Sequence, residues 1–103
     1  MCGLTAPDIE GMRHAVRDSG FREGASTAEF VQFLDEEAVR DVVFSNPGYF
    51  AHPLVTCREF IERDGALFLN RQMRCDADRM SCDAALQEFN DLDAQMIAEM
   101  RGQ

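Results

Sequence analysis

Residues 26–45 read STAEFVQFLDEEAVRDVVFS, and the secondary structure of this stretch decides the fold class. Several of its apolar residues recur at the i, i+3, i+4 spacing of one helix face: Val31, Leu34, Ala38 and Val42. Ser26 precedes Glu29 by three residues, which is the spacing of a capping box at a helix N-terminus. The stretch ends at Pro47-Gly48, a pair typical of a tight turn. We therefore predict a helix over residues 26–45.

Three other segments begin in the same way, with a hydroxyl residue that can accept hydrogen bonds from the free amides of a first helical turn. These residues are Thr5, Thr56 and Ser81. The predicted helices span residues 5–20, 56–74 and 81–101, and the second of them either continues or breaks near 64–65, where a Gly interrupts it.

No segment alternates apolar and polar residues for long enough to indicate a sheet. The connecting loops are short, which is typical of a helical bundle. The sequence therefore predicts an all-α fold, a compact bundle of four to five short helices that forms a single helical domain over residues 1–103.

The composition is that of a small globular protein, because 46% of the 103 residues are hydrophobic. No apolar run approaches the roughly 20 residues that span a bilayer. The N-terminal residues lack the basic region and apolar stretch of a secretory signal. These features favour a cytoplasmic location.

The net charge of −9 favours a basic partner and disfavours direct binding to nucleic acid or to an anionic membrane. The candidate contact residues are acids on two of the predicted helices: Asp35, Glu36, Asp41, Asp83, Glu88 and Asp91. If both acidic faces point the same way, they form a negative surface that docks a basic protein or imitates a nucleic-acid backbone. The alternative is that these acids are a solvated face that only keeps the protein soluble.

The aromatic stretch FSNPGYF at residues 44–50 offers two further contact residues, Tyr49 and Phe50. Aromatic side chains in loops often anchor protein interfaces. The alternative is that they cover one end of the core.

Residues 18–30, DSGFREGASTAEF, resemble an EF-hand calcium loop in their first acid and their closing Glu-Phe, and residues 76–89 resemble one less completely. Calcium needs six to eight oxygen ligands, but Arg22 occupies a ligand position in the first stretch. Gln87 replaces the bidentate Glu in the second. We therefore expect no calcium site. The resemblance leaves open a metal-free, degenerate pair that clasps a partner helix, as a light chain does.

Four cysteines occur without any C-x-x-C spacing, so the strong zinc and redox signatures are missing. Four residues offer the nitrogen and sulfur ligands of a tetrahedral zinc site, although their spacing matches no standard site. They are His52, Cys57, Cys75 and Cys82. The other interpretations are a Cys75–Cys82 disulfide under oxidising conditions and free thiols with Cys57 buried as an apolar residue. We expect no metal and no cofactor.

The sequence favours a non-enzymatic function. It contains no Gly-rich phosphate loop, and a Cys57–His52 nucleophile pair would lack the orienting third group. We predict a protein-binding module, a regulator or inhibitor that docks on a basic surface of its partner. The alternatives are an accessory subunit of a larger assembly or the EF-hand-like clasp, followed by a zinc-binding protein. The sequence leaves the oligomeric state open.

Overall fold

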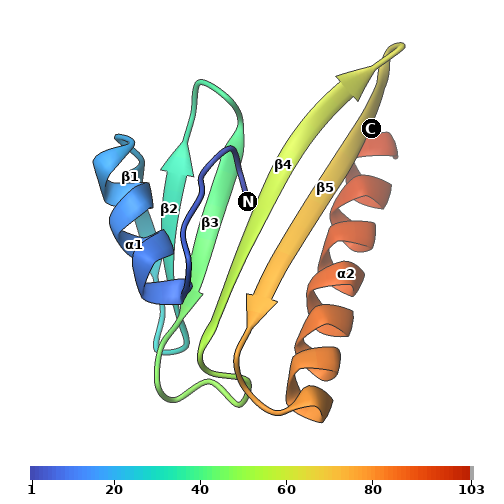
Figure 1. Ribbon diagram of the computed structural model, residues 1–103. Helices are drawn as coiled ribbons and strands as arrows, with labels where there is room; N and C mark the ends of the chain where they lie inside the picture. Colours follow the sequence, from blue (N-terminus) through green and yellow to red (C-terminus); the bar gives the residue numbers. More distant parts are fainter. Residues whose placement is uncertain (103) are drawn as a thin grey trace.

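The computed structural model describes residues 1–102 and contains a five-stranded antiparallel sheet with one helix near each end of the chain (Figure 1). Each strand pairs with the next one along the chain, so the sheet order is β1-β2-β3-β4-β5. In chain order the elements are α1 (Ile9–Asp18), β1 (Arg22–Ser26), β2 (Phe30–Asp35), β3 (Arg40–Ser45), β4 (Leu54–Arg63), β5 (Ala66–Cys75) and α2 (Arg79–Arg101).

The prediction of an all-α bundle, and with it of a helical domain, is therefore wrong. The predicted helix 26–45 is the β2–β3 hairpin, and the predicted helix 56–74 lies within the β4–β5 hairpin. Of the four predicted helices, only those at 5–20 and 81–101 correspond to helices in the structure. The observed helices begin at Ile9 and Arg79.

The residues of 26–45 favour strands because successive side chains point to opposite faces of the sheet, where apolar residues pair across the hairpin. Val31 lies opposite Phe44, and Phe33 lies opposite Val42, on one face of the sheet. Aromatic and β-branched residues pack well on a pleated surface. The hydroxyl of Thr27 accepts from the amides of Glu29 and Phe30 at 3.2 and 3.1 Å. The apparent cap near Ser26 is therefore part of a strand connection and not of a helix.

The β4–β5 hairpin turns at Asp64-Gly65. Both residues have a positive φ, of 53° and 79°, which is the combination that a two-residue hairpin turn requires. The strands then pair from Arg63–Ala66 at the turn to Leu54–Cys75 at the far end. The Gly at which the predicted helix either continues or breaks is therefore part of a hairpin turn.

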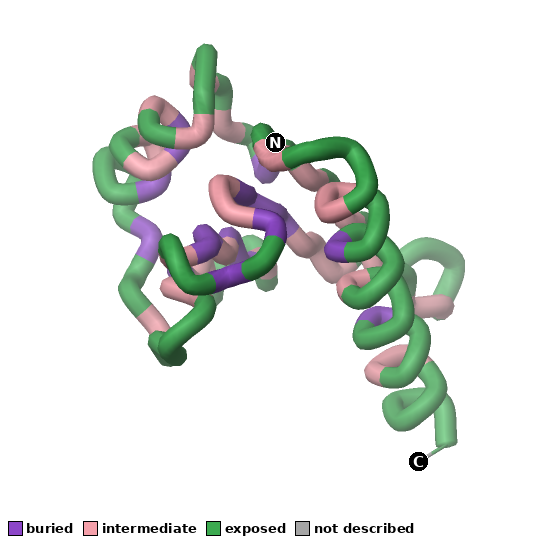
Figure 2. The backbone as a smooth tube through the Cα atoms, turned by 90° about the horizontal axis from the view of Figure 1, so that it is seen from below, coloured by how far each residue is buried: buried purple, intermediate pink, exposed green. Residues whose placement is uncertain are grey.

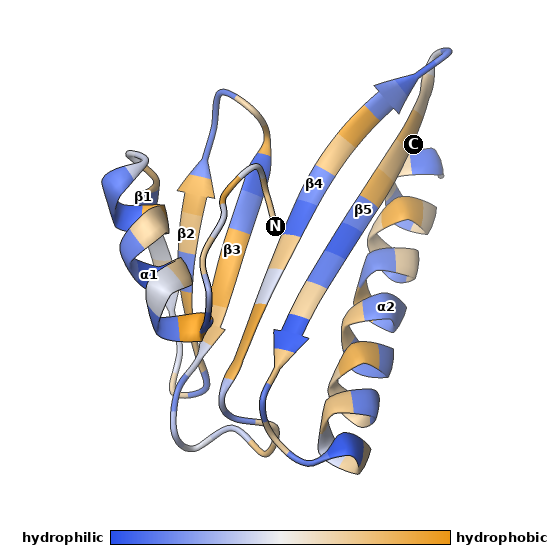
Figure 3. Ribbon diagram, viewed as in Figure 1, coloured by the Kyte–Doolittle hydropathy of each residue, from blue (hydrophilic) through white to orange (hydrophobic). Residues whose placement is uncertain are grey.

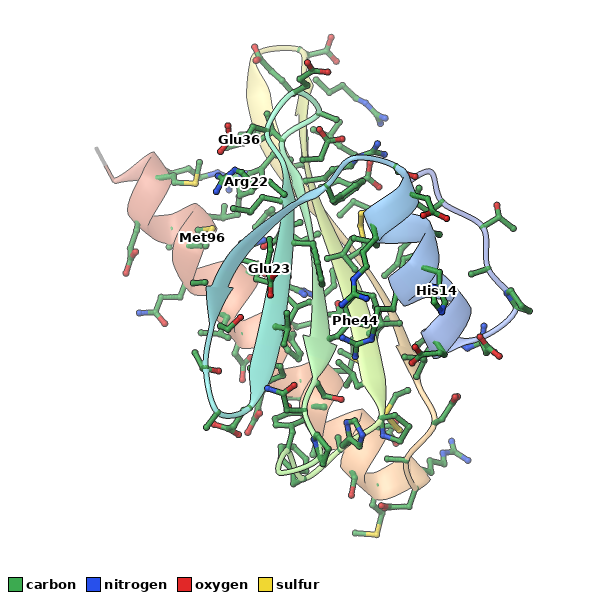
Figure 4. All side chains as sticks on the ribbon, turned by 90° about the vertical axis from the view of Figure 1, so that its left-hand side faces the viewer. His14, Arg22, Glu23, Glu36, Phe44 and Met96 are labelled. Atoms are coloured by element: carbon green, nitrogen blue, oxygen red, sulfur yellow. A yellow bond between two sulfur atoms is a disulfide. The ribbon has the colours of Figure 1, made fainter. Side chains whose placement is uncertain are left out.

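One face of the sheet, called here the α1 face, is covered by α1 and the N-terminal residues. Its core contains nine buried residues: Cys2, Met12, Val16, Phe21, Phe33, Val42, Phe44, Val55 and Cys57. Helix α1 begins at the Asp8 side chain, which accepts from the Gly11 amide at 2.6 Å. Figure 4 shows the sheet nearly edge-on, with α1 and α2 on opposite sides of it.

The other face, called here the α2 face, packs against α2 near β5. The buried residues of this second core are Tyr49, Ala51, Leu54 and Ala85. The Asp78 carboxylate accepts from the Ser81 amide at 3.0 Å and caps α2. The hydrogen bonds from Ser81 lower the pKa of Asp78 below its ordinary value, since they stabilise the charged form.

Helix α2 is largely exposed. In Figure 2 the helix that leads to the C-terminus is mostly green, with purple and pink along one side. Within residues 1–102, neither helix combines the length and the apolar character that crossing a bilayer demands.

Candidate functional site

Helix α2 covers only part of its sheet face. It packs against β5 and reaches β4 where the Arg58 Nη1 donates to the Met96 Sδ at 3.6 Å. In the described part of the chain, no helix lies over β1, β2 and β3 on this face (Figures 1 and 4). Strands are about 4.8 Å apart, so the uncovered strip is roughly 10–14 Å wide. This width matches the roughly 10 Å diameter of one helix.

Two adjoining hollows of about 270 and 250 Å³ lie along this strip. They share Gln32, Asp41 and Arg58, so we describe them as one feature, the groove. The apolar residues of the first hollow include Phe30, Val43, Phe89 and Leu92, and those of the second are Leu34, Val39 and Phe60. The groove therefore combines apolar walls with a polar floor.

The floor of the groove is a buried ion pair between neighbouring strands. Asp41 and Arg58 lie opposite each other in the β3–β4 register, and the Arg58 Nη2 donates to the Asp41 Oδ2 at 3.0 Å. The Gln32 amide donates to the same oxygen at 2.9 Å. The Asp41 side chain is only 8% exposed. Its charge is therefore balanced inside the protein and is not available to a partner.

One donor in this floor has no partner. The Nε of Arg58 is buried and makes no hydrogen bond within residues 1–102. A buried donor left unsatisfied costs roughly 1–3 kcal/mol.

A second ion pair fixes α2, and with it one wall of the groove. The Nε and Nη2 of Arg71 donate to the two carboxylate oxygens of Asp93 at 2.6 and 2.7 Å. Arg71 also donates to the Thr56 hydroxyl at 2.9 Å, and its guanidinium lies 4.7 Å from the centre of the Phe89 ring. Figure 3 shows the hydrophilic middle of β4 and β5 from which these charges arise. Paired bonds of this kind hold α2 in one orientation.

The α2 wall of the groove is acidic as well as apolar. Four residues follow one another at spacings of four, three and four, so they share one stripe of the helix: Glu88, Leu92, Gln95 and Glu99. Leu92 lines the groove and is 56% exposed. An exposed leucine between acids suits a partner that is both apolar and basic.

The opposite end of the groove is bordered by acids of the β2–β3 turn. The Arg40 Nε donates to Asp35 at 2.9 Å, and this hydrogen bond lowers the pKa of the Asp35 carboxyl below its ordinary value. Glu36 forms an ion pair with Arg22 of β1, and Figure 4 shows their side chains pointing toward one another.

The structure places the eight predicted contact residues in three groups. Asp35, Glu36 and Asp41 line the groove. The other acids lie on α2, where Glu88 accepts from the Tyr49 hydroxyl at 3.3 Å. Asp91 accepts from Gln87, and Asp83 pairs with Arg79. Tyr49 is only 5% exposed, whereas Phe50 beside it is 50% exposed.

Sequence reasoning missed the residues that organise the groove, above all Arg58, Arg71 and Asp93. Asp93 offered a signal, because it falls among the apolar positions of the 81–101 helix. A carboxylate on such a stripe indicates a buried cationic partner. The two arginines gave no signal while their segment was interpreted as a helix.

The four residues considered as a zinc site in the sequence do not lie together in the structure. Cys57 is joined to Cys2, and Cys75 to Cys82, with Cα–Cα distances of 5.9 and 5.8 Å. His52 instead forms a hydrogen bond with Ser45 at 2.7 Å. The Cys75–Cys82 disulfide, one of the interpretations left open, is confirmed. The burial expected for Cys57 is also confirmed, at 1% exposure, although its thiol is not free.

Each EF-hand-like stretch has a helix on one side only. The first stretch, residues 18–30, runs through β1 and its turn. The second stretch leads directly into α2 at Arg79, with β5 and not a helix before it. Neither stretch has the helix–loop–helix geometry of an EF-hand.

The Tyr49 hydroxyl gives a pH-dependent readout of the second core. Burial, and then the neighbouring Glu88, raise the pKa of Tyr49 to about 12 from the ordinary 10.0. The unfolded chain therefore loses this proton first, so stability falls as the pH rises from about 10 to about 12. Because Tyr49 is the only tyrosine, an ultraviolet titration of the phenolate reports it alone. Glu88→Gln should lower the midpoint but leave it above 10, since burial is the larger cause. A wild-type midpoint near 10 would contradict this environment.

The groove offers apolar contact area, an acidic rim and a floor whose charges are already paired. Such an arrangement suits the binding of a macromolecular partner more than that of a small charged ligand. No family model, no curated protein and no solved structure matches this chain.

Proposed function

We propose that this chain is a small acidic protein-binding module that accepts a basic amphipathic helix of its partner in the groove beside α2. As a regulator or inhibitor, it would act by occupying that helix. The observation that carries the proposal is the strip of the α2 face that is one helix wide and lies next to a fixed helical wall.

The length of the groove sets the length of the partner segment that it can accept. Strands β2 and β3 have six residues each, which corresponds to about 20 Å at 3.4 Å per residue. A helix covers that distance with about 13 residues. Its apolar residues at i, i+3 or i+4, and i+7 would contact the groove in turn. Phe30, Val43 and Leu34 provide partly exposed contact surfaces along this path.

Charge favours a basic helix over an acidic one. The exposed acids Glu88 and Glu99 lie on the same stripe of α2 as Leu92. Glu36, which pairs with Arg22, borders the groove at the β2–β3 turn. The net charge of −9 adds a long-range attraction, which speeds encounter and weakens with salt. The partner does not need to neutralise Asp41, because Arg58 already does so.

The binding test uses a synthetic 14-residue helical peptide of Leu, Ala and Lys, measured by fluorescence anisotropy. Leu92→Asp should weaken binding at least about tenfold, because it places a charge on the apolar contact. Leu86→Asp is the matched control. Leu86 is also exposed, at 41%, but it lies about 120° around the helix axis from Leu92.

Two further results would support the proposal: weaker binding at high salt, and no binding of the peptide with Glu in place of Lys. Equal losses in the Leu92 and Leu86 variants would show that the peptide does not occupy the groove.

We propose a cytoplasmic location, as the sequence predicts. Cytoplasmic thiols are kept reduced, so the two cysteine pairs would be thiols there and disulfides after oxidation. Alkylation of the protein in its native cells would measure this. Two intact disulfides in those cells would contradict the location.

A further inference from the structure

Cys2, Cys57 and Glu59 lie together at the edge of the α1 core. One ligand atom from each lies within 4.8 Å of the other two. Cys57 and Glu59 are two residues apart on β4, so they point to the same face of the sheet. This is the one group of three or more Cys, His, Asp or Glu side chains with this proximity in residues 1–102.

The structure holds each of these residues in place through neighbouring elements. The Cys2 amide donates to the Gln72 Oε1 of β5 at 3.3 Å, and the Cys2 carbonyl accepts from Arg40 of β3. Cys2 has a φ of 50°, in the left-handed region that a non-Gly residue seldom occupies. Glu59 lies opposite Arg40 in the β3–β4 register. Hydrogen bonds and strand pairing therefore fix the positions of the three ligand residues, including Cys2 near the chain terminus.

We propose that the reduced protein binds one Zn²⁺ through the Cys2 and Cys57 thiolates and the Glu59 carboxylate. Zinc binds sulfur at about 2.3 Å and oxygen at about 2.0–2.2 Å, with tetrahedral geometry. Ligand atoms around it are therefore roughly 3.5–3.8 Å apart. After reduction the two sulfurs, which are bonded in the disulfide, must separate to this distance. The Glu59 carboxylate, within 4.8 Å of both, needs only a small rotation. Thiolates select zinc over magnesium or calcium.

Burial and charge fit this ion. Both sulfurs belong to residues that are 1% exposed, whereas Glu59 is partly exposed and provides the route of entry. Two thiolates and one carboxylate carry three negative charges, so zinc leaves one. The guanidinium of Arg40, which also pairs with Asp35, donates to the Cys2 carbonyl and places a cation beside the site. Water completes the fourth position, as it does where zinc has three protein ligands.

The site has two exclusive states. In the oxidised state the Cys2–Cys57 disulfide joins the N-terminal residues to β4. A dithiol reductant gives two electrons and two protons, which break the S–S bond into two thiols while the dithiol becomes a disulfide. Zn²⁺ then binds both sulfurs and releases their two protons to water. Either the disulfide or the ion connects Cys2 to Cys57, so the N-terminal residues stay on the core.

The second cysteine pair supplies the matched control. Cys75 and Cys82 also form a disulfide, but no third Cys, His, Asp or Glu of the described residues completes a metal group there. The double variant Cys75→Ser, Cys82→Ser should therefore keep zinc binding. Cys57→Ser should remove it.

The experiment titrates Zn²⁺ into phosphine-reduced protein against a chromophoric chelator. We expect one zinc per chain in the wild type and in the Cys75/Cys82 double variant, and none in the oxidised protein. Glu59→Gln should weaken binding by about 10–100-fold or more, because the loss of even an outer partner has an effect of that size. Its partly exposed position preserves the fold, which a thermal melt verifies.

Three outcomes overturn the proposal: no zinc in the reduced double variant, unchanged affinity in Glu59→Gln, or one zinc retained by Cys57→Ser. The result is independent of the groove, because the peptide assay and the zinc titration use different surfaces of the protein.

Discussion

Replacing Asp93 with Ala is expected to lower the free energy of unfolding by about 3–5 kcal/mol. Asp93 is 9% exposed and accepts two hydrogen bonds from Arg71. One of its oxygens also lies 3.9 Å from the Arg58 Nη1. The variant removes the carboxylate that pairs with the Arg71 guanidinium beneath α2. A buried charge without a counter-charge destabilises the folded state.

Urea denaturation measures this change, and Asp91→Ala is the control. Asp91 lies two residues away on the same helix but is exposed, so its replacement should change stability by about 0.5 kcal/mol or less. A double variant, Arg71→Met with Asp93→Leu, should recover much of the loss, because removing both charges also removes their desolvation. A loss below about 1 kcal/mol for Asp93→Ala would show that the pair is not buried.

Replacing Phe44 with Ala is expected to cost about 3–5 kcal/mol through lost burial and the cavity that remains. Phe44 is 0% exposed in the α1 core. Its ring packs edge-to-face on Phe33 at 5.8 Å, and the Arg13 guanidinium lies 4.6 Å from its centre. Figure 4 shows the Phe44 side chain close to α1. The substitution therefore weakens the contact between sheet and helix at its centre.

Phe50→Ala is the matched control for Phe44→Ala. The Phe50 ring packs at a tilt against Tyr49, with ring centres 4.6 Å apart, but is half exposed. Its loss should therefore cost about 1 kcal/mol or less. Thermal and urea unfolding of both variants measures the difference. Similar losses for the two variants would contradict the α1 core, because they would place both rings in equivalent surroundings.

The helices were predictable from the sequence, whereas the sheet was not. Ile9, Met12 and Val16 form a short apolar stripe, which is part of α1 in the structure, although Asp8 and not the expected Thr5 caps the helix. In 26–45 the same residues fit two periods, because Val31 and Val42 belong both to the helical spacing and to the alternating faces of β2 and β3. Pairing between strands that are distant in the sequence selects the sheet over the helix. Local residue propensity does not include this pairing.

The Asp64-Gly65 pair is a local signal for the hairpin turn that the structure contains. Asp-Gly between strand-forming segments indicates a two-residue hairpin turn, and residues 66–69 contain leucines and a phenylalanine. A helix over 56–74, whether continuous or broken at this Gly, leaves no place for the β4–β5 hairpin.

The structure places some of the predicted contact residues near the groove. Asp35 and Glu36 line it, and Glu88 lies on α2, which forms its wall. That they contact a partner stays a prediction. The floor was not predictable, since Asp41 meets Arg58 only through the β3–β4 register. Arg58 in turn lies opposite Arg71, and α2 supplies the carboxylate between them from a distant part of the chain.

The most direct test of the groove maps the amide chemical shifts of the isotope-labelled protein during titration with the basic helical peptide. We expect saturable shifts at Gln32, Val43 and Leu92, with α1 unchanged. Shifts gathered on α1 or on the loop around Phe50, or no saturable shift at all, would contradict it.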